Sequence, residues 1–183
     1  MFVPATNEKF VAKAHTRGAD MIILDLEDSI PPAEKEAARQ ALPAAARAIK
    51  GHGVEVCVRI NRPLEMAVPD IAAAILPDVS ALMLPKIMGP EHVRLLSEVV
   101  AVREAIQGIE IGRTRFICVV ETPDALPNLN AIAAASPRVA AIGVGAEDLC
   151  TEMESTPGAD SLYVFAMMVV AAARANGVLP MGS

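Results

Sequence analysis

The chain has 183 residues, a length that one domain with a sizeable core accounts for. Its formal net charge is −6 and it has no basic stripe, so nucleic acid is not expected as a partner. No stretch approaches the roughly 18 uninterrupted apolar residues of a membrane span, so no membrane partner is expected. Cys57, Cys118 and Cys150 lack metal-ligand spacing and fit a reducing, cytoplasmic setting.

Short apolar runs recur along the chain, and the first six each end in a polar cluster. The predicted strands are Met1–Val3, Met21–Leu24, Val54–Val58, Ala81–Leu84, Arg115–Val120 and Val139–Val144, with Val178–Met181 as the start of a seventh. Charge at the carboxyl ends of buried parallel strands is typical of the catalytic face of a parallel barrel.

Helical patterns fill the segments between these strands. The predicted helices are Asn7–Arg17, Pro31–Lys50, Asp70–Leu76, Pro90–Ile106, Ala125–Ala135 and Leu162–Asn176. Pro43 is expected to kink or divide the second helix. The last helix is apolar nearly all round, which predicts that it is buried between the barrel and another body.

The alternation of strands and helices predicts an α/β protein with a parallel sheet. We expect a (β/α)8 TIM barrel that is incomplete in this chain, with strands 1–6 and the start of strand 7. Residues 1–183 would form a single catalytic domain whose C-terminal part is absent, since such barrels need about 250 residues. An open doubly wound sheet is the alternative, but it concentrates ligand groups at one switch point.

Two acidic residues at consecutive strand ends, Glu121 and Asp148, are the candidate metal ligands. Neighbouring parallel strands would place the two carboxylates side by side, and carboxylate oxygens with open positions beside them suit Mg²⁺. The simpler alternative is that each acid caps a following helix or turn, as Asp148 is placed to do.

Further polar residues follow three other strands. Arg59 could clamp a substrate carboxylate with two-point geometry, or it could form a structural ion pair with Asp25 or Glu27. At least one of these two acids is expected to accept from Arg59 or from a metal-bound water. Lys86 adds positive charge, and the acids around it would keep it protonated, which disfavours a Schiff-base role.

Six motifs together resemble the citrate lyase beta subunit-like family, within the HpcH/HpaI aldolase and citrate lyase superfamily. They are Phe2–Ala5, Ile23–Asp28, Val58–Asn61, Leu84–Lys86, Val120–Pro123 and Gly145–Leu149, in the family's order and spacing. Each motif alone is weak, but the set extends over essentially the whole chain.

The resemblance implies a TIM barrel with Mg²⁺-dependent carbon–carbon lyase chemistry on 3-hydroxyacyl thioesters such as citryl-CoA or malyl-CoA. The products would be an acetyl-type thioester and an oxo acid. It assigns Glu121 and Asp148 to the metal and Arg59 to the substrate. With the residues beside them, the candidate catalytic set is Arg59, Glu27 and Asp28, and the candidate substrate-binding set is Arg59, Glu121 and Lys86.

The chain departs from this family at both ends. Relatives continue through an eighth strand and a C-terminal helical region, and they carry a basic N-terminal extension. We therefore expect a longer polypeptide, or a barrel completed by another segment, because open strand edges invite association. A homo-oligomer is expected, and trimers are common among the relatives.

Two other functions compete with a thioester lyase. A class II aldolase acting on small hydroxy-oxo acids without CoA would need much the same residues. A non-catalytic subunit that binds a metabolite would differ in class.

Overall fold

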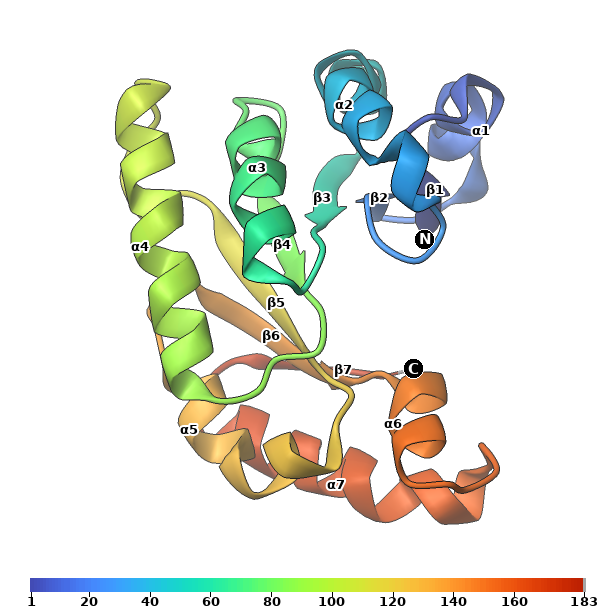
Figure 1. The fold of residues 1–183 in the computed structure, drawn as a ribbon, viewed down its shortest axis with the longest axis vertical. Coiled ribbons are helices and arrows are strands. Elements are labelled where there is room, and N and C mark those ends of the chain that lie inside the picture. The colour runs from blue at the N-terminus through green and yellow to red at the C-terminus, as the bar shows by residue number, and fades with distance from the viewer. Residues whose placement is uncertain (183) are drawn as a thin grey trace. The chain divides into compact units, whose positions relative to one another are not determined.

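The computed structural model describes residues 1–182, along which seven β-strands alternate with helices (Figure 1). The strands are β1 (Phe2–Pro4), β2 (Met21–Asp25), β3 (Glu55–Arg59), β4 (Ala81–Leu84), β5 (Arg115–Val120), β6 (Val139–Val144) and β7 (Leu179–Met181). The α-helices are α1 (Glu8–Ala14), α2 (Lys35–Lys50), α3 (Leu64–Ala74), α4 (Pro90–Ile106), α5 (Leu129–Ala133), α6 (Ala146–Glu152) and α7 (Ala159–Ala175). Short 3-10 turns η1 (His15–Arg17), η2 (Pro32–Glu34) and η3 (Pro123–Asn128) flank three of them.

The residues form two compact units. The first contains Met1–Met83 and Val99–Thr114, and the second contains Leu84–Glu98 and the described residues from Arg115 onward. Strands β1, β2, β3 and β4 are neighbours in that order, and so are β5, β6 and β7. Parallel strands that neighbour one another in chain order and alternate with helices are the arrangement of a TIM barrel. Seven of the eight strands of that fold lie in residues 1–182, which confirms the predicted incomplete barrel.

Strand register determines which polar residues meet. The parallel pairing of β2 with β3 sets Asp25 opposite Arg59. The pairing of β5 with β6 ends at Val120 opposite Val144, so that the next residue of each strand, Glu121 and Gly145, come together. The register thus builds one polar cluster at the end of β2 and β3 and another at the end of β5 and β6.

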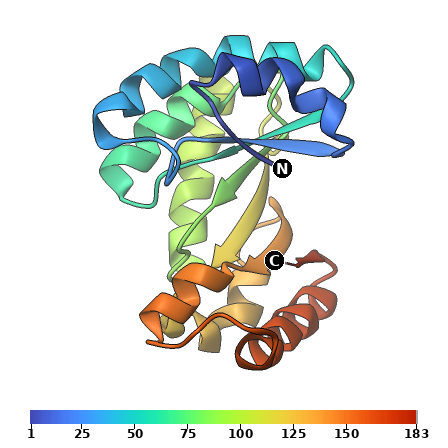
Figure 2. The same cartoon turned by 90° about the vertical axis from the view of Figure 1, so that its right-hand side faces the viewer.

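The core of each unit consists of apolar strands covered by helices. Every residue of β4 is buried, as expected for strands that pack on both faces. In the first unit, α2 packs on β2 and β3 (Figure 2). Its buried side chains lie on one stripe at helical spacing, which includes Leu42, Ala45, Ala46 and Ile49. In the second unit, α7 packs on β6 and β7.

Two prolines lie inside helices that continue past them, and the predicted division of the second helix at Pro43 is wrong. Pro43 lies inside a continuous α2, on its exposed side, and the buried stripe on the other side holds the helix together. Pro69 likewise lies inside α3, which begins at Leu64 instead of Asp70. On an exposed face the carbonyl four residues before a proline can turn toward water, so that tertiary packing outweighs the lost hydrogen bond.

Two further differences concern the second unit. Helix α6, directly after β6, was not among the predicted helices. Helix α7 is not buried all round, because Tyr163 and Val164 are more than half exposed and Met167 is 48% exposed.

No helix within residues 1–182 is long and apolar enough to cross a membrane.

Candidate functional site

Glu121 is held at the end of β5 by two backbone features. Its carboxylate is buried, and Oε2 accepts a hydrogen bond from the Lys86 backbone N–H at 3.0 Å. Gly145, at the end of β6, donates its N–H to the Val120 carbonyl at 3.0 Å. A Cβ at Gly145 would lie 2.3 Å from Glu121 Cγ and 2.4 Å from Oε1, closer than real contacts allow. Any side chain at this position would force the Glu121 carboxylate to move.

Asp148 lies in the first turn of α6, three residues beyond Gly145. Gly145 is the N-cap of this helix and no side chain caps it, so the alternative that Asp148 serves as the cap is not what the structure shows. The Asp148 side chain is 43% exposed. A carboxylate in the first turn is stabilised by the positive end of the helix dipole without being removed from solvent.

Lys86 contacts both of these acids. Its backbone N–H reaches Glu121, and its ammonium Nζ lies 3.0 Å from Asp148 Oδ2. Lys86 has φ +48°, in the left-handed region that residues other than glycine seldom adopt. Such conformations persist only where the surroundings enforce them, and they concentrate at functional sites. We call Glu121, Asp148, Lys86 and Gly145 the two-acid cluster.

The donor set of this cluster fits a hard divalent cation such as Mg²⁺. It offers carboxylate oxygens and the glycine space beside Glu121 Oε1, with no nitrogen or sulfur ligand. Within residues 1–182 there is no group of three or more histidine, cysteine or acidic side chains that could enclose a metal. Held by two carboxylates, a cation here would keep positions for water or substrate oxygens, as Mg²⁺ commonly does.

The second polar cluster surrounds Arg59 at the end of β3. Its Nε and Nη2 bind the two oxygens of Asp25, each at 2.7 Å. Its Nη1 lies 3.1 Å from Glu27 Oε2 and 3.1 Å from Asp28 Oδ2. The guanidinium also lies over the Phe2 ring, 4.8 Å from its centroid. The structural ion pair with Asp25 and Glu27, one of the two alternatives for Arg59, is therefore present.

We call Arg59, Asp25, Glu27 and Asp28 the arginine cluster. Burial and hydrogen bonds determine the pKa values of Asp25 and Arg59 in it. Burial raises the pKa of Asp25, but hydrogen bonds from Arg59, Ser29 and the Glu27 amide outweigh it and lower that pKa to about 2. Burial also lowers the pKa of Arg59, and its bonds to Asp25 and the nearby acids outweigh this and raise it. At neutral pH, Asp25 and Arg59 are thus a charged, two-point ion pair.

A buried network that the sequence reasoning missed supports the loop after β2. Asp70 in α3 accepts from both the backbone N–H and the Nδ2 of Asn61, each at 2.7 Å, and from Arg39 Nε at 2.7 Å. Asn61 also donates to the Leu26 carbonyl at 2.9 Å, and Lys35 donates to the same carbonyl at 2.6 Å. Asn61, two residues after β3, was a signal available in the sequence, whereas Asp70 in a helix carried none.

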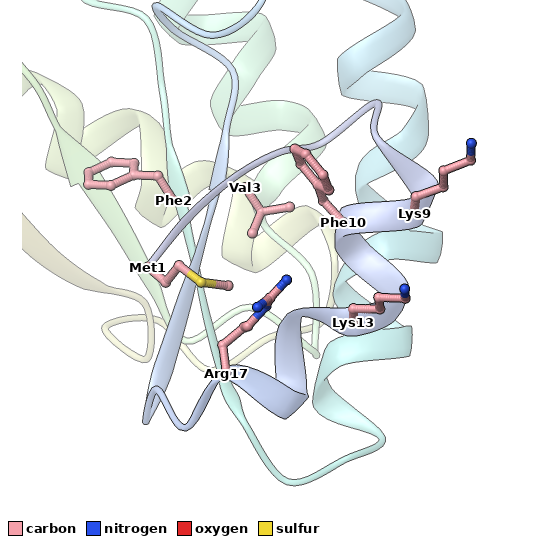
Figure 3. A pocket seen from close by; sticks show the side chains of 7 residues that line it. All are labelled: Met1, Phe2, Val3, Lys9, Phe10, Lys13 and Arg17. Carbon is pink, nitrogen blue, oxygen red and sulfur yellow. The ribbon is translucent and has the colours of Figure 1, made fainter.

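A hollow of about 520 Å³ lies beside β1 and α1 in the first unit. Its lining combines apolar and basic side chains (Figure 3), namely Met1, Phe2, Val3, Lys9, Phe10, Lys13 and Arg17. None of the predicted site residues is among them.

The three cysteines are buried and free, and burial raises the pKa of Cys57 and Cys118 to about 12, which makes them inert as nucleophiles.

Comparison with known proteins places the chain in one family. The family model described as HpcH/HpaI aldolase/citrate lyase matches residues 1–182. Citrate lyase subunit beta of Leuconostoc mesenteroides is 32% identical over 97% of this chain and 60% of its own length. L-malyl-CoA/beta-methylmalyl-CoA lyase of Cereibacter sphaeroides is 31% identical over 97% of this chain and 61% of its own.

A solved structure extends this similarity to the fold. The protein CitE from Mycobacterium tuberculosis, in complex with magnesium and acetate, is 28% identical with a TM-score of 0.75, over 99% of this chain and 71% of that one. The chain spans about 60% of the length of the citrate lyase subunit from Leuconostoc. The sequence match and the shared strand–helix order agree, and the chain belongs to the HpcH/HpaI aldolase/citrate lyase family.

Proposed function

We propose that this chain carries the metal site of a Mg²⁺-dependent carbon–carbon lyase. The reaction would cleave, or form, a 3-hydroxyacyl thioester such as citryl-CoA or malyl-CoA, with an acetyl-type thioester and an oxo acid as the other partners. The observation that carries the proposal is the two-acid cluster, in which a glycine space accommodates Glu121 and Asp148 lies one helical turn away. The names of the relatives support the substrate class.

In this proposal Glu121 and Asp148 hold the cation by their carboxylate oxygens, and Lys86 adds positive charge for the anionic substrate. When bound, the cation supplies Lewis-acid polarisation of the oxo-acid oxygens. The rigid placement of Glu121 by the Lys86 N–H means that the site reorganises little as charge develops, which lowers the barrier.

Arg59, Glu27 and Asp28 are proposed for substrate binding and proton transfer. The Nε and Nη2 nitrogens of Arg59, which form one edge of the guanidinium, both bind Asp25, so a substrate carboxylate would compete for Nη1. Asp28 is the more replaceable partner of that nitrogen, since its side chain is 57% exposed and Glu27 is 9% exposed. In the cleavage direction a carboxylate takes the hydroxyl proton, the carbon–carbon bond breaks, and the electron pair is left on the thioester as an enolate.

The direct test is an assay for oxo-acid release from citryl-CoA and malyl-CoA, with Mg²⁺ and then with a chelator. We expect release only with Mg²⁺ and its loss in Asp148→Asn. The matched control Asp160→Asn alters an exposed acid in the first turn of α7 and should leave release unchanged.

Other results would favour the competing functions. Metal-dependent cleavage of a hydroxy-oxo acid without CoA would indicate a class II aldolase. Oxo-acid binding without turnover of any of these compounds would indicate a non-catalytic subunit.

A further inference from the structure

Lys86 contacts the two acids of the two-acid cluster through two different groups. The backbone N–H binds Glu121 and the side-chain ammonium binds Asp148, each at 3.0 Å. A side-chain substitution therefore removes the contact with Asp148 and keeps the backbone contact with Glu121. Lys86 makes both contacts from a left-handed backbone, at φ +48°.

The surroundings of the two contacts differ. Glu121 is 6% exposed and is enclosed by Gly145, whereas the side chains of Lys86 and Asp148 are 31% and 43% exposed. An ion pair between partly exposed groups is weak and is readily exchanged. The Glu121 end of the cluster is therefore fixed, and the Asp148 end can change its partner.

We propose that Lys86 is a positioning residue whose ammonium acts as an internal counter-ion for Asp148 and competes with the divalent cation for this carboxylate. Asp148 exchanges the ammonium for the cation, and the ammonium released in this way is available to the anionic substrate. Without metal, Lys86 keeps two acids of the same charge from repelling each other. The inference rests on the metal site of the proposed function.

If Lys86 competes with the cation, its replacement should change the affinities for cation and anion in opposite directions. Replacing Lys86 by methionine removes a positive charge next to the cation site and keeps the backbone N–H to Glu121. Mg²⁺ affinity should rise about 10-fold, because one like charge is lost at close range. Oxaloacetate affinity at saturating Mg²⁺ should fall. A change that merely loosened the structure would weaken both.

The experiment is a calorimetric titration of Mg²⁺, without substrate, into wild type, Lys86→Met and Lys86→Arg. Lys86→Arg keeps the charge and should bind Mg²⁺ as the wild type does. Weaker or equal Mg²⁺ binding by Lys86→Met would overturn the inference. Asp148→Asn separates this failure from failure of the metal site, since loss of binding in that variant supports the site whatever Lys86 does.

A measurement on the unaltered protein keeps the test valid if Lys86→Met does not fold. Amine labelling read by mass spectrometry should show Lys86 reacting faster with Mg²⁺ than with chelator, because its ammonium is then released from Asp148. Lys9 on the exposed face of α1 is the internal control and should react equally in both. Equal or slower labelling of Lys86 with Mg²⁺ would contradict the exchange.

Discussion

The arginine cluster of the first unit and the two-acid cluster of the second both follow consecutive parallel strands, yet they treat their acids differently. Asp25 is almost fully buried and is bound at both oxygens by Arg59. Asp148 is 43% exposed and is bound by a lysine of intermediate exposure. A two-point buried pair resists exchange, whereas a single contact at the surface permits it. Acids after a strand therefore differ in function according to the cation that neutralises them.

Removal of Arg59 should have the largest effect on stability. Arg59→Met should lower the free energy of unfolding by about 3–5 kcal/mol, because it leaves the Asp25 charge buried without its partner. Urea unfolding of the variant measures this. The control is Arg47→Met, whose pair with Asp78 spans 4.0 Å and is 84% exposed on the arginine side, so the change should stay within about 0.5 kcal/mol. A loss below about 1 kcal/mol for Arg59→Met would show that the arginine cluster is not structural.

A side chain added at Gly145 tests whether Glu121 belongs to the metal site. Gly145→Ala should cost about 1–3 kcal/mol in unfolding free energy and should abolish Mg²⁺ binding, because a Cβ displaces Glu121. Urea unfolding and Mg²⁺ calorimetry measure the two effects. Gly89→Ala, where an added Cβ meets its nearest atom at 3.7 Å, is the control and should keep Mg²⁺ binding. Normal Mg²⁺ binding by Gly145→Ala would remove Glu121 from the metal site.

Acid pH should lower the free energy of unfolding through protonation of Asp25. The pKa of Asp25 is about 2 in the folded chain and 3.8 ordinarily, so its ionisation stabilises the fold above pH 4. This contribution, about 2 kcal/mol, is lost as the pH falls from 4 toward 2. Unfolding free energies measured across that range should fall less steeply for Asp25→Asn than for wild type. Equal slopes would contradict the lowered pKa.

The sequence predicted the strands better than the helices, for a physical reason. Strands β4, β5 and β6 have the predicted bounds, because a short apolar run between polar residues leaves little choice of limits. The start of α3 and the continuity of α2 were not predicted, because prolines that local rules treat as breaks are tolerated under tertiary packing. The exposure of α7 depends on what covers a helix, which its periodicity does not contain.

The candidate site divides in the same way. Glu121, Asp148 and Arg59 were predicted from their places after strands, and the pairing of Arg59 with Asp25 was one of two alternatives. The space that Gly145 leaves for Glu121 depends on the register of β5 with β6, which no local sequence pattern contains. The double contact of Lys86 also could not be predicted, because it is made from a left-handed backbone, which a lysine seldom adopts.

The measurement that tests the central claim most directly is a calorimetric titration of oxaloacetate into the chain, first with Mg²⁺ and then with a chelator. Wild type should bind oxaloacetate only with Mg²⁺, and Glu121→Gln and Asp148→Asn should lose this binding while unfolding as cooperatively as wild type. Metal-dependent binding that persisted in both variants would contradict the assignment of the two-acid cluster as the metal site.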